Sequence, residues 1–208
     1  MKIAIIAASG KAGNLIVEDA LKRKYDVTAI VRDASKVIQD IPVVEKDILS
    51  IKKEDLQPFD VVINAFGAKE SDPIIYQTST RHLIKELEGT SIRMIVVGGA
   101  GSLYIAEGLQ LIDTPEFPAE IKPGAEAARQ YLEMIKKNEV LDWTFFSPAI
   151  EMHQGTAGVR KGTYRTALEN PVFDENGRSV LSVEDVAVAL VDELENGKFV
   201  KQRFTAAY

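Results

Sequence analysis

The sequence contains no cysteine and only two histidines among its 208 residues. The lack of cysteine excludes disulfides, thiolate nucleophiles and cysteine metal sites, and His82 and His153 are too far apart in the chain to suggest a zinc site. No apolar run approaches the roughly 20 residues of a membrane-spanning helix. No run of lysine or arginine suggests a nucleic-acid surface, and the first residues lack a signal-peptide pattern. We therefore expect a cytoplasmic protein without metal, membrane or nucleic-acid partners.

The composition that remains is that of one globular domain. Hydrophobic residues make up 46% of the chain, charged residues make up 27%, and the net charge is −6. These are ordinary values for a protein with a sizeable core, and an α/β chain of this length often folds as one unit. The sequence shows no internal repeat or interdomain linker, so we expect a single domain over residues 1–208, as a monomer or homodimer.

The chain is organised around its first thirty-odd residues. Residues 2–7 form an almost continuous apolar run, as expected of a strand buried on both faces of a parallel sheet. A glycine turn follows, then apolar residues at helical spacing over 14–24, then a second strand over 26–31. Glycine in such a turn lets backbone N–H groups at the helix start approach a pyrophosphate. The unit predicts a dinucleotide site, and the alternative is a tight turn without a ligand.

Two details of this unit bear on the cofactor. The turn reads Ala7-x-x-Gly10-x-x-Gly13, with alanine where a G-x-x-G-x-x-G pattern has its first glycine. The second strand ends in Arg32 and Asp33. An acid near there accepts hydrogen bonds from the ribose 2′-OH of NAD, whereas an arginine accommodates the 2′-phosphate of NADP. Arg32 is nearer the strand end, so we expect NADP(H) to be preferred over NAD(H), with Asp33 capping the next short helix.

The rest of the chain alternates strand and helix, which predicts a Rossmann-like α/β fold with a doubly wound parallel sheet. Residues 105–122 are expected to form a long loop, and residues 149–181 a small C-terminal substrate lobe with short strands at 162–166 and 178–181. The other expected strands are 42–46, 59–63, 92–97, 142–146 and 199–206, and the expected helices are 34–38, 51–56, 72–87, 123–138 and 183–194.

Ligands of open α/β sheets bind beyond the carboxyl ends of the strands. The expected cofactor contacts are therefore in the glycine turn and in the segments that follow successive strands. They are Ala7, Ser9, Gly10, Lys11, Ala12, Gly13, Arg32, Asp47, Ile48, Ala65, Phe66, Gly67, Gly99, Ala100, Ser147 and Pro148.

Three segments carry a family resemblance. Residues 2–13, 96–102 and 141–148 together resemble an atypical short-chain dehydrogenase/reductase. The likeness is nearest to bacterial NAD(P)H-binding proteins of the NADH–flavin reductase type, which are similar in turn to biliverdin reductase B/flavin reductase and to NmrA-like proteins. It covers essentially the whole chain and implies the cofactor more clearly than the substrate. Similar members commonly carry arginine after the second strand, which again favours Arg32 and NADPH.

The sequence departs from ordinary short-chain reductases in one respect. Those enzymes carry Tyr-x-x-x-Lys, whose tyrosine donates a proton to the substrate, but no tyrosine of this chain has a lysine four positions later. Reduction of an isolated ketone needs such a general acid, whereas a flavin or another conjugated acceptor delocalises the incoming charge. The sequence thus favours an NADPH-dependent oxidoreductase that acts on a small conjugated molecule such as a flavin. The alternative, from the NmrA-like resemblance, is a redox sensor that binds the dinucleotide without turnover.

Four side chains are candidates for catalysis. Ser102 stands where the family has a serine and could bond the acceptor, or it could cap a turn. Tyr104 could be an aromatic wall or a packing residue. Lys122 lies near a catalytic lysine of isoflavone-reductase-like proteins, or it is an ordinary exposed lysine. His153 could donate a proton near neutral pH or be exposed to solvent.

The two functional hypotheses predict different surroundings for the site. Aromatic and titratable residues around one mouth would favour the reductase, namely Tyr104, Phe117, His153 and Tyr164. A closed mouth beside an exposed apolar patch would favour the sensor.

Overall fold

The computed structural model describes residues 1–67 and 72–208. Its centre is an eight-stranded sheet with strand order β3-β2-β1-β4-β5-β8-β10-β9. Neighbouring strands pair in parallel except at the β9 edge, where β9 runs antiparallel to β10. The predicted doubly wound parallel sheet is therefore confirmed. The strands are β1 (Lys2–Ile6), β2 (Asp26–Val31), β3 (Val43–Glu45), β4 (Val61–Asn64), β5 (Arg93–Val97), β8 (Trp143–Ser147), β9 (Arg165–Ala167) and β10 (Gln202–Ala207).

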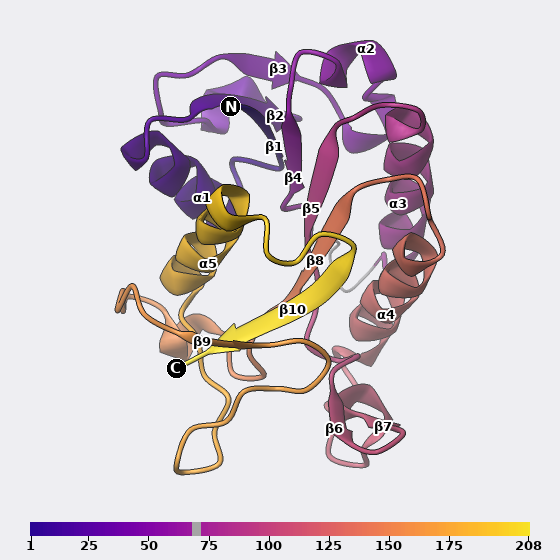
Figure 1. Ribbon diagram of the computed structural model, residues 1–208, viewed down its shortest axis with the longest axis vertical. Coiled ribbons are helices and arrows are strands. Elements are labelled where there is room, and N and C mark those ends of the chain that lie inside the picture. Colours follow the sequence, from indigo (N-terminus) through magenta and orange to yellow (C-terminus); the bar gives the residue numbers. More distant parts are fainter. Residues whose placement is uncertain (68–71) are drawn as a thin grey trace.

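Two pairs of helices cover the sheet, one pair on each face (Figure 1). Helices α1 (Lys11–Lys22) and α5 (Val183–Asn196) pack together on one face, and α3 (Ile74–Leu87) and α4 (Lys122–Lys136) on the other. Each face has its own buried apolar cluster. Burial of one leucine or isoleucine side chain stabilises the fold by about 1.5–3 kcal/mol. Both clusters contain strand and helix residues, so they hold the helices against the sheet and keep the strand ends in place. Helix α2 (Lys53–Leu56) is short.

The turn between β1 and α1 forms despite its missing first glycine. Ala7 has a φ angle of 60°, in the left-handed region that favours glycine. The Ala7 carbonyl accepts a hydrogen bond from the Gly10 amide at 2.9 Å, which closes the turn. Helix α1 then begins at Lys11, earlier than the expected residue 14. A Cβ at Gly13 would lie 2.3 Å from the Ala7 carbonyl oxygen, so only glycine lets α1 lie this close to β1.

Three sequence expectations are corrected. The segment 105–122 is not simply a loop, because β6 (Tyr104–Ala106) and β7 (Leu109–Gln110) form a small hairpin and η3 (Leu111–Asp113) follows. The strand expected over 178–181 is wrong, since this segment makes only an isolated bridge from Val180 to Glu151. The helix expected over 34–38 is the single turn η1 (Ala34–Lys36), and the helix expected over 51–56 is the shorter α2. Two further single turns, η2 (Ile48–Ser50) and η4 (Gln154–Thr156), lie in segments with no expected helix.

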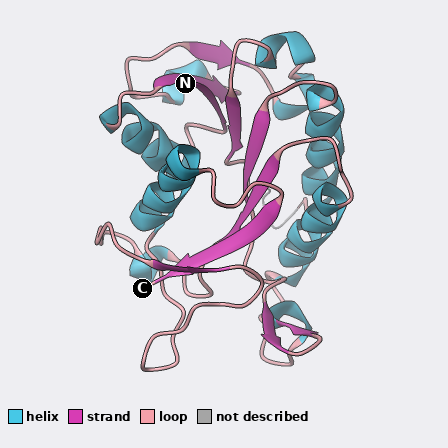
Figure 2. Ribbon diagram, viewed as in Figure 1, coloured by secondary structure: helices cyan, strands magenta, loops and turns pink. Residues whose placement is uncertain are grey.

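The loops gather at one end of the molecule. Figure 2 shows the β6–β7 hairpin and most of residues 149–181 beyond the same end of the sheet, at the bottom of the view. The carboxyl ends of β5, β8 and β10 point toward this end in Figure 1. The fold thus leaves the strand ends accessible to segments that can build a binding site. None of the described helices is long and apolar enough to cross a membrane.

Candidate functional site

A cavity of about 390 Å³ lies beyond the carboxyl ends of β1, β2 and β4. Because β1 lies between β2 and β4 in the sheet, this is the point at which the chain changes direction across the sheet, the usual ligand position in doubly wound folds. Most of the residues predicted to contact a cofactor meet here. Those lining the cavity are Ala7, Ser9, Gly10, Lys11, Arg32, Ile48, Ala65, Phe66 and Gly67.

The geometry of the first cavity fits a dinucleotide pyrophosphate. Gly10 caps α1 but offers no side-chain acceptor, and the first turn of the helix carries no acidic residue. The first amide groups of α1 are thus available to an anion, and the helix dipole favours negative charge there. The missing Cβ of Gly10 leaves room for the phosphate oxygens to approach the backbone.

The side chains of the first cavity are mainly cationic. It is lined by Lys11, Arg32, Lys36 and Lys46, against the single carboxylate of Asp33. Among the described residues, Arg32 has no ion pair or side-chain hydrogen bond. Its guanidinium is exposed and can therefore approach a phosphate. Lys46 is instead held by Asp55, with its Nζ 2.7 Å and 2.6 Å from the two carboxylate oxygens.

Asp33 is occupied by its own turn. Its carboxylate accepts hydrogen bonds from the Ser35 amide at 3.1 Å and the Ser35 hydroxyl at 2.6 Å, and Lys36 Nζ lies 3.4 Å away. The bond from the Ser35 hydroxyl is the largest influence on Asp33 and, with Lys36, holds the pKa of its carboxyl below the ordinary value. The predicted capping role of Asp33 is confirmed.

A second cavity, of about 480 Å³, lies between the loop after β5, the first half of α4 and the segment 111–121. Gly99 and Ala100, both predicted as cofactor contacts, line its inner wall. Small residues of α4 leave the space open, whereas the outer wall is apolar and partly aromatic. That outer wall comprises Leu111, Phe117, Pro118 and Ile121.

The two cavities share a wall of aromatic rings. Phe66 lines the first and Tyr76 lines the second, and their ring centroids are 6.1 Å apart. Tyr76 in turn packs against Tyr131, at 6.3 Å. Tyr131 is buried, its hydroxyl accepts a hydrogen bond from Asn64 Nδ2 at 2.9 Å, and burial raises its pKa. Since β4 and β5 are neighbours in the sheet, ligands in the two cavities would lie over adjacent strand ends.

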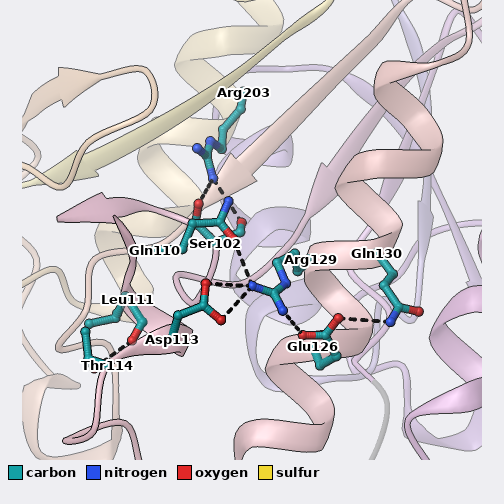
Figure 3. A network of polar contacts seen from close by, with 9 residues as sticks. All are labelled: Ser102, Gln110, Leu111, Asp113, Thr114, Glu126, Arg129, Gln130 and Arg203. Carbon is teal, nitrogen blue, oxygen red and sulfur yellow. Dashed lines mark hydrogen bonds and ion pairs between the residues drawn. The ribbon is translucent and has the colours of Figure 1, made fainter. Parts of the chain in front are cut away.

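The outer wall of the second cavity is fixed to α4 by Arg129 (Figure 3). One guanidinium nitrogen donates to both carboxylate oxygens of Asp113, at 3.0 Å and 2.9 Å, and to Gln110 Oε1 at 3.1 Å. The other donates to Glu126, one turn earlier on α4. Burial lowers the pKa of Arg129, but the hydrogen bonds to Glu126 and Asp113 raise it by more. Arg129 therefore stays charged and holds the segment after β7 against the helix.

Ser102 does not line either cavity. The residue is buried, and its Oγ and its carbonyl oxygen each accept a hydrogen bond from Arg203 Nη1 at 2.9 Å (Figure 3). Arg203 is itself buried on β10 and is also paired with Glu169. Because a buried guanidinium needs acceptors, the structure gives Ser102 a structural partner.

The other catalytic candidates also lie outside both cavities. The Tyr104 amide donates to the Glu169 carbonyl at 2.9 Å. Lys122 is exposed at the start of α4, and exposed His153 caps η4 by accepting a bond from the Gly155 amide at 3.0 Å. Catalytic roles for these residues stay predictions without support from the cavities.

The aromatic and titratable residues expected around one mouth are not brought together. Phe117 lines the second cavity, but Tyr164 lines a third cavity, of about 410 Å³, beside α5 and β10. There burial, together with a hydrogen bond from its hydroxyl to Asp192, raises the pKa of the tyrosine. Of the four residues expected around one mouth, Phe117 alone lines the second cavity.

Several predicted cofactor residues lie outside the two cavities. Gly13 packs against Ala7, and the Asp47 carboxylate caps its own turn by accepting from the Leu49 amide at 3.0 Å. Ser147 and Pro148 are buried, and Ala12 is half-buried. Lys46 also lines the first cavity but was not predicted, because the expected strand 42–46 included it, whereas β3 ends at Glu45.

Comparisons with known proteins agree with the fold and with nicotinamide-cofactor binding. A protein family described as NAD(P)H-binding matches residues 7–197. YwnB of Bacillus subtilis is 44% identical over 99% of this chain and 97% of its own length. A Streptococcus pneumoniae protein called a "putative NADH-flavin reductase" is 43% identical, with a TM-score of 0.93 over 100% of this chain and 99% of its own. A Bacteroides thetaiotaomicron protein called a "putative epimerase" is 39% identical, with a TM-score of 0.88 over 100% of this chain and 96% of its own.

Proposed function

The chain belongs to the NAD(P)H-binding family, and from this premise we propose that it is an NADPH-dependent reductase that transfers a hydride to a flavin or a similar conjugated acceptor. The observation that carries the proposal is the pair of neighbouring cavities with different linings. The first is cationic and has a glycine turn at a helix start, whereas the second is mainly apolar and opens over the adjacent strand. We expect the protein to work in the cytoplasm, as a monomer or homodimer, with 149–181 on the substrate side.

The residues of the first cavity have distinct roles in this proposal. The amides at the start of α1 would bind the pyrophosphate, and Lys11 would add positive charge there. Arg32 would bind the 2′-phosphate, and Ile48 would pack against the adenine. Bound NADPH would supply the hydride and leave as NADP⁺. Phe66 and Tyr76, between the cavities, would exclude water from the place where the two ligands meet.

The second cavity suits an acceptor that needs no general acid from the protein. Among its described lining residues, only Tyr76 and Glu116 have ionisable side chains, and the sequence has no Tyr-x-x-x-Lys pair. A conjugated acceptor can take the hydride and then a proton from water, which completes its two-electron reduction. The absence of a Tyr-x-x-x-Lys pair also disfavours the alternative of a sugar epimerase that works through an oxidised intermediate, because that reaction needs a proton-transferring group. A cavity of about 480 Å³ beside the cofactor site favours turnover over a purely sensing role.

We predict that riboflavin or a quinone will oxidise NADPH catalytically in the presence of the protein. The decay of the reduced-nicotinamide absorbance with acceptor measures this turnover, and a reaction without protein is the control. The Ser102→Ala variant separates the original catalytic hypothesis from the observed structural contact. An unchanged kcat would remove Ser102 from the chemistry. Tight NADPH binding with no turnover of any conjugated acceptor would favour the sensor instead.

We predict a preference for NADPH that depends on Arg32. Arg32→Ala should lose roughly 1.5–3 kcal/mol of NADPH affinity, the range for a charged hydrogen bond, while NADH affinity hardly changes. Calorimetric titration with both dinucleotides measures the two effects. Asp33→Ala is the matched control, because that carboxylate is occupied by Ser35 and Lys36. Equal wild-type affinities for NADH and NADPH, or a selective loss of NADH binding in Asp33→Ala, would show that Arg32 is not the selecting residue.

A further inference from the structure

The second cavity has an unbalanced negative charge at its rim. Among the described residues that line it, Glu116 is the only one with a charged side chain. Glu116 is exposed and has no ion pair within the described part of the chain. A ligand in this cavity therefore meets one carboxylate and no lysine or arginine among the described lining residues.

The neighbouring charges add to this imbalance. Asp113 and Glu126 share the single guanidinium of Arg129, so this cluster has one carboxylate in excess. Across residues 111–129 the sequence has four carboxylates and two cations. The other described walls, which are the loop after β5 and residues Tyr76 and Ile150, contribute no charge. The excess negative charge therefore lies on the side of the cavity formed by residues 111–129, and no cation on the other described walls offsets it.

The first cavity has the opposite charge. Four cationic side chains line it against one carboxylate, as a ligand with several phosphates requires. If the second ligand also carried a phosphate, the same chemistry would be expected at the second cavity. A phosphate dianion beside Glu116 would instead be repelled, because like charges near the surface cost binding energy and salt screens the effect.

We infer that the acceptor is a planar conjugated molecule without a phosphate, either uncharged or cationic, and that Glu116 selects against phosphorylated acceptors. The inference rests on the proposed function and names the substrate class of that same site. Glu116 is then a specificity-determining residue at the rim, and the apolar wall of Phe117 and Leu111 supplies the area that binds the ring system.

Riboflavin and FMN provide a direct test, because they share the isoalloxazine ring and differ by the phosphate. At low ionic strength kcat/KM should be about 3- to 10-fold higher for riboflavin, the size expected for a few partly exposed charges, and the ratio should fall as salt is added. Glu116→Gln should move the ratio toward one. Glu133→Gln, an exposed position of α4 that lines neither cavity, is the matched control and should leave the ratio unchanged.

A binding measurement separates this inference from the proposed function. Quenching of flavin fluorescence, with NADP⁺ present and no turnover, should show the same preference for riboflavin and the same shift in Glu116→Gln. If neither flavin is reduced but riboflavin binds more tightly, the proposed function fails and the charge selection stands. If both are reduced with equal kcat/KM, or FMN is preferred, the inference is overturned and the proposed function stands. Melting temperatures of the variants check that each is folded.

Discussion

Gly10→Val should lower NADPH affinity by about 100-fold or more while the protein remains folded, a loss of about 2.7 kcal/mol of binding free energy. The backbone at Gly10 has φ −75° and ψ 166°, an extended conformation that valine can adopt. The methyl groups of valine would occupy the space through which a pyrophosphate reaches the first amides of α1. Each charge-assisted hydrogen bond lost there is worth about 1.5–3 kcal/mol, so loss of two would suffice.

The cost of this substitution to the fold should be small. A Cβ at residue 10 would lie 3.2 Å from the Ala7 carbonyl oxygen, which requires the turn to give by a few tenths of an ångström. Valine is also a poorer helix cap than glycine by about 1 kcal/mol, so the melting temperature should fall by about 2–4 °C. Gly10→Ala, with a single added carbon, should show a smaller loss of affinity. A folded valine variant that binds NADPH normally would place the cofactor elsewhere.

Long periodic segments made most of the fold predictable. The apolar runs that became β1 and β5, and the helical spacing that became α4 and α5, each extend over enough residues to show their period. The β6–β7 hairpin was missed because strands of two or three residues have no measurable period. The segment 178–181 was overpredicted for the same reason, since its few backbone hydrogen bonds go to Glu151, Asp174 and Tyr208 instead of forming a ladder.

The sequence predicted which loops form the site, but it predicted less well which of their side chains face a cavity. Parallel strand ends identify the segments beyond them, and the first cavity follows that rule closely. The direction of a side chain depends on distant partners. Ser102 follows the loop that lines the second cavity, yet its hydroxyl bonds to Arg203, 101 residues later in the sequence. No local pattern marks a buried arginine on the seventh strand of the sheet order, so this contact required the structure.

The two glycines of the turn can be told apart by their surroundings. Gly10 faces the first cavity, whereas Gly13 is buried in the first turn of α1. The sequence pattern marks both glycines as positions where another group comes close to the backbone. Gly10 is open to the cavity, where we propose that a ligand approaches, whereas Gly13 lies against the backbone of Ala7. Substitution at Gly13 should therefore act on folding.

Gly13→Ala should destabilise the protein by about 3 kcal/mol, the upper part of the range for overpacking a core. The added Cβ would lie 2.3 Å from the Ala7 carbonyl oxygen and 2.9 Å from the Ala8 Cα. Both are backbone atoms and cannot rotate away as a side chain would. Helix α1 must then shift from β1, which loosens the packing of buried Ile16 and Ala20. The melting temperature should fall by about 6–12 °C.

Thermal unfolding of Gly13→Ala beside Gly124→Ala tests this account. Gly124 lies in α4, and a Cβ there meets nothing within 4 Å, so alanine should leave stability unchanged or raise it by up to about 1 kcal/mol through helix propensity. At a temperature where Gly13→Ala is folded, it should also bind NADPH more weakly, because a displaced α1 moves the amides that would hold the pyrophosphate. A Gly13→Ala variant that melts like the wild type would mean that α1 does not lie this close to β1. The close packing of helix on strand would then not be what positions the cofactor.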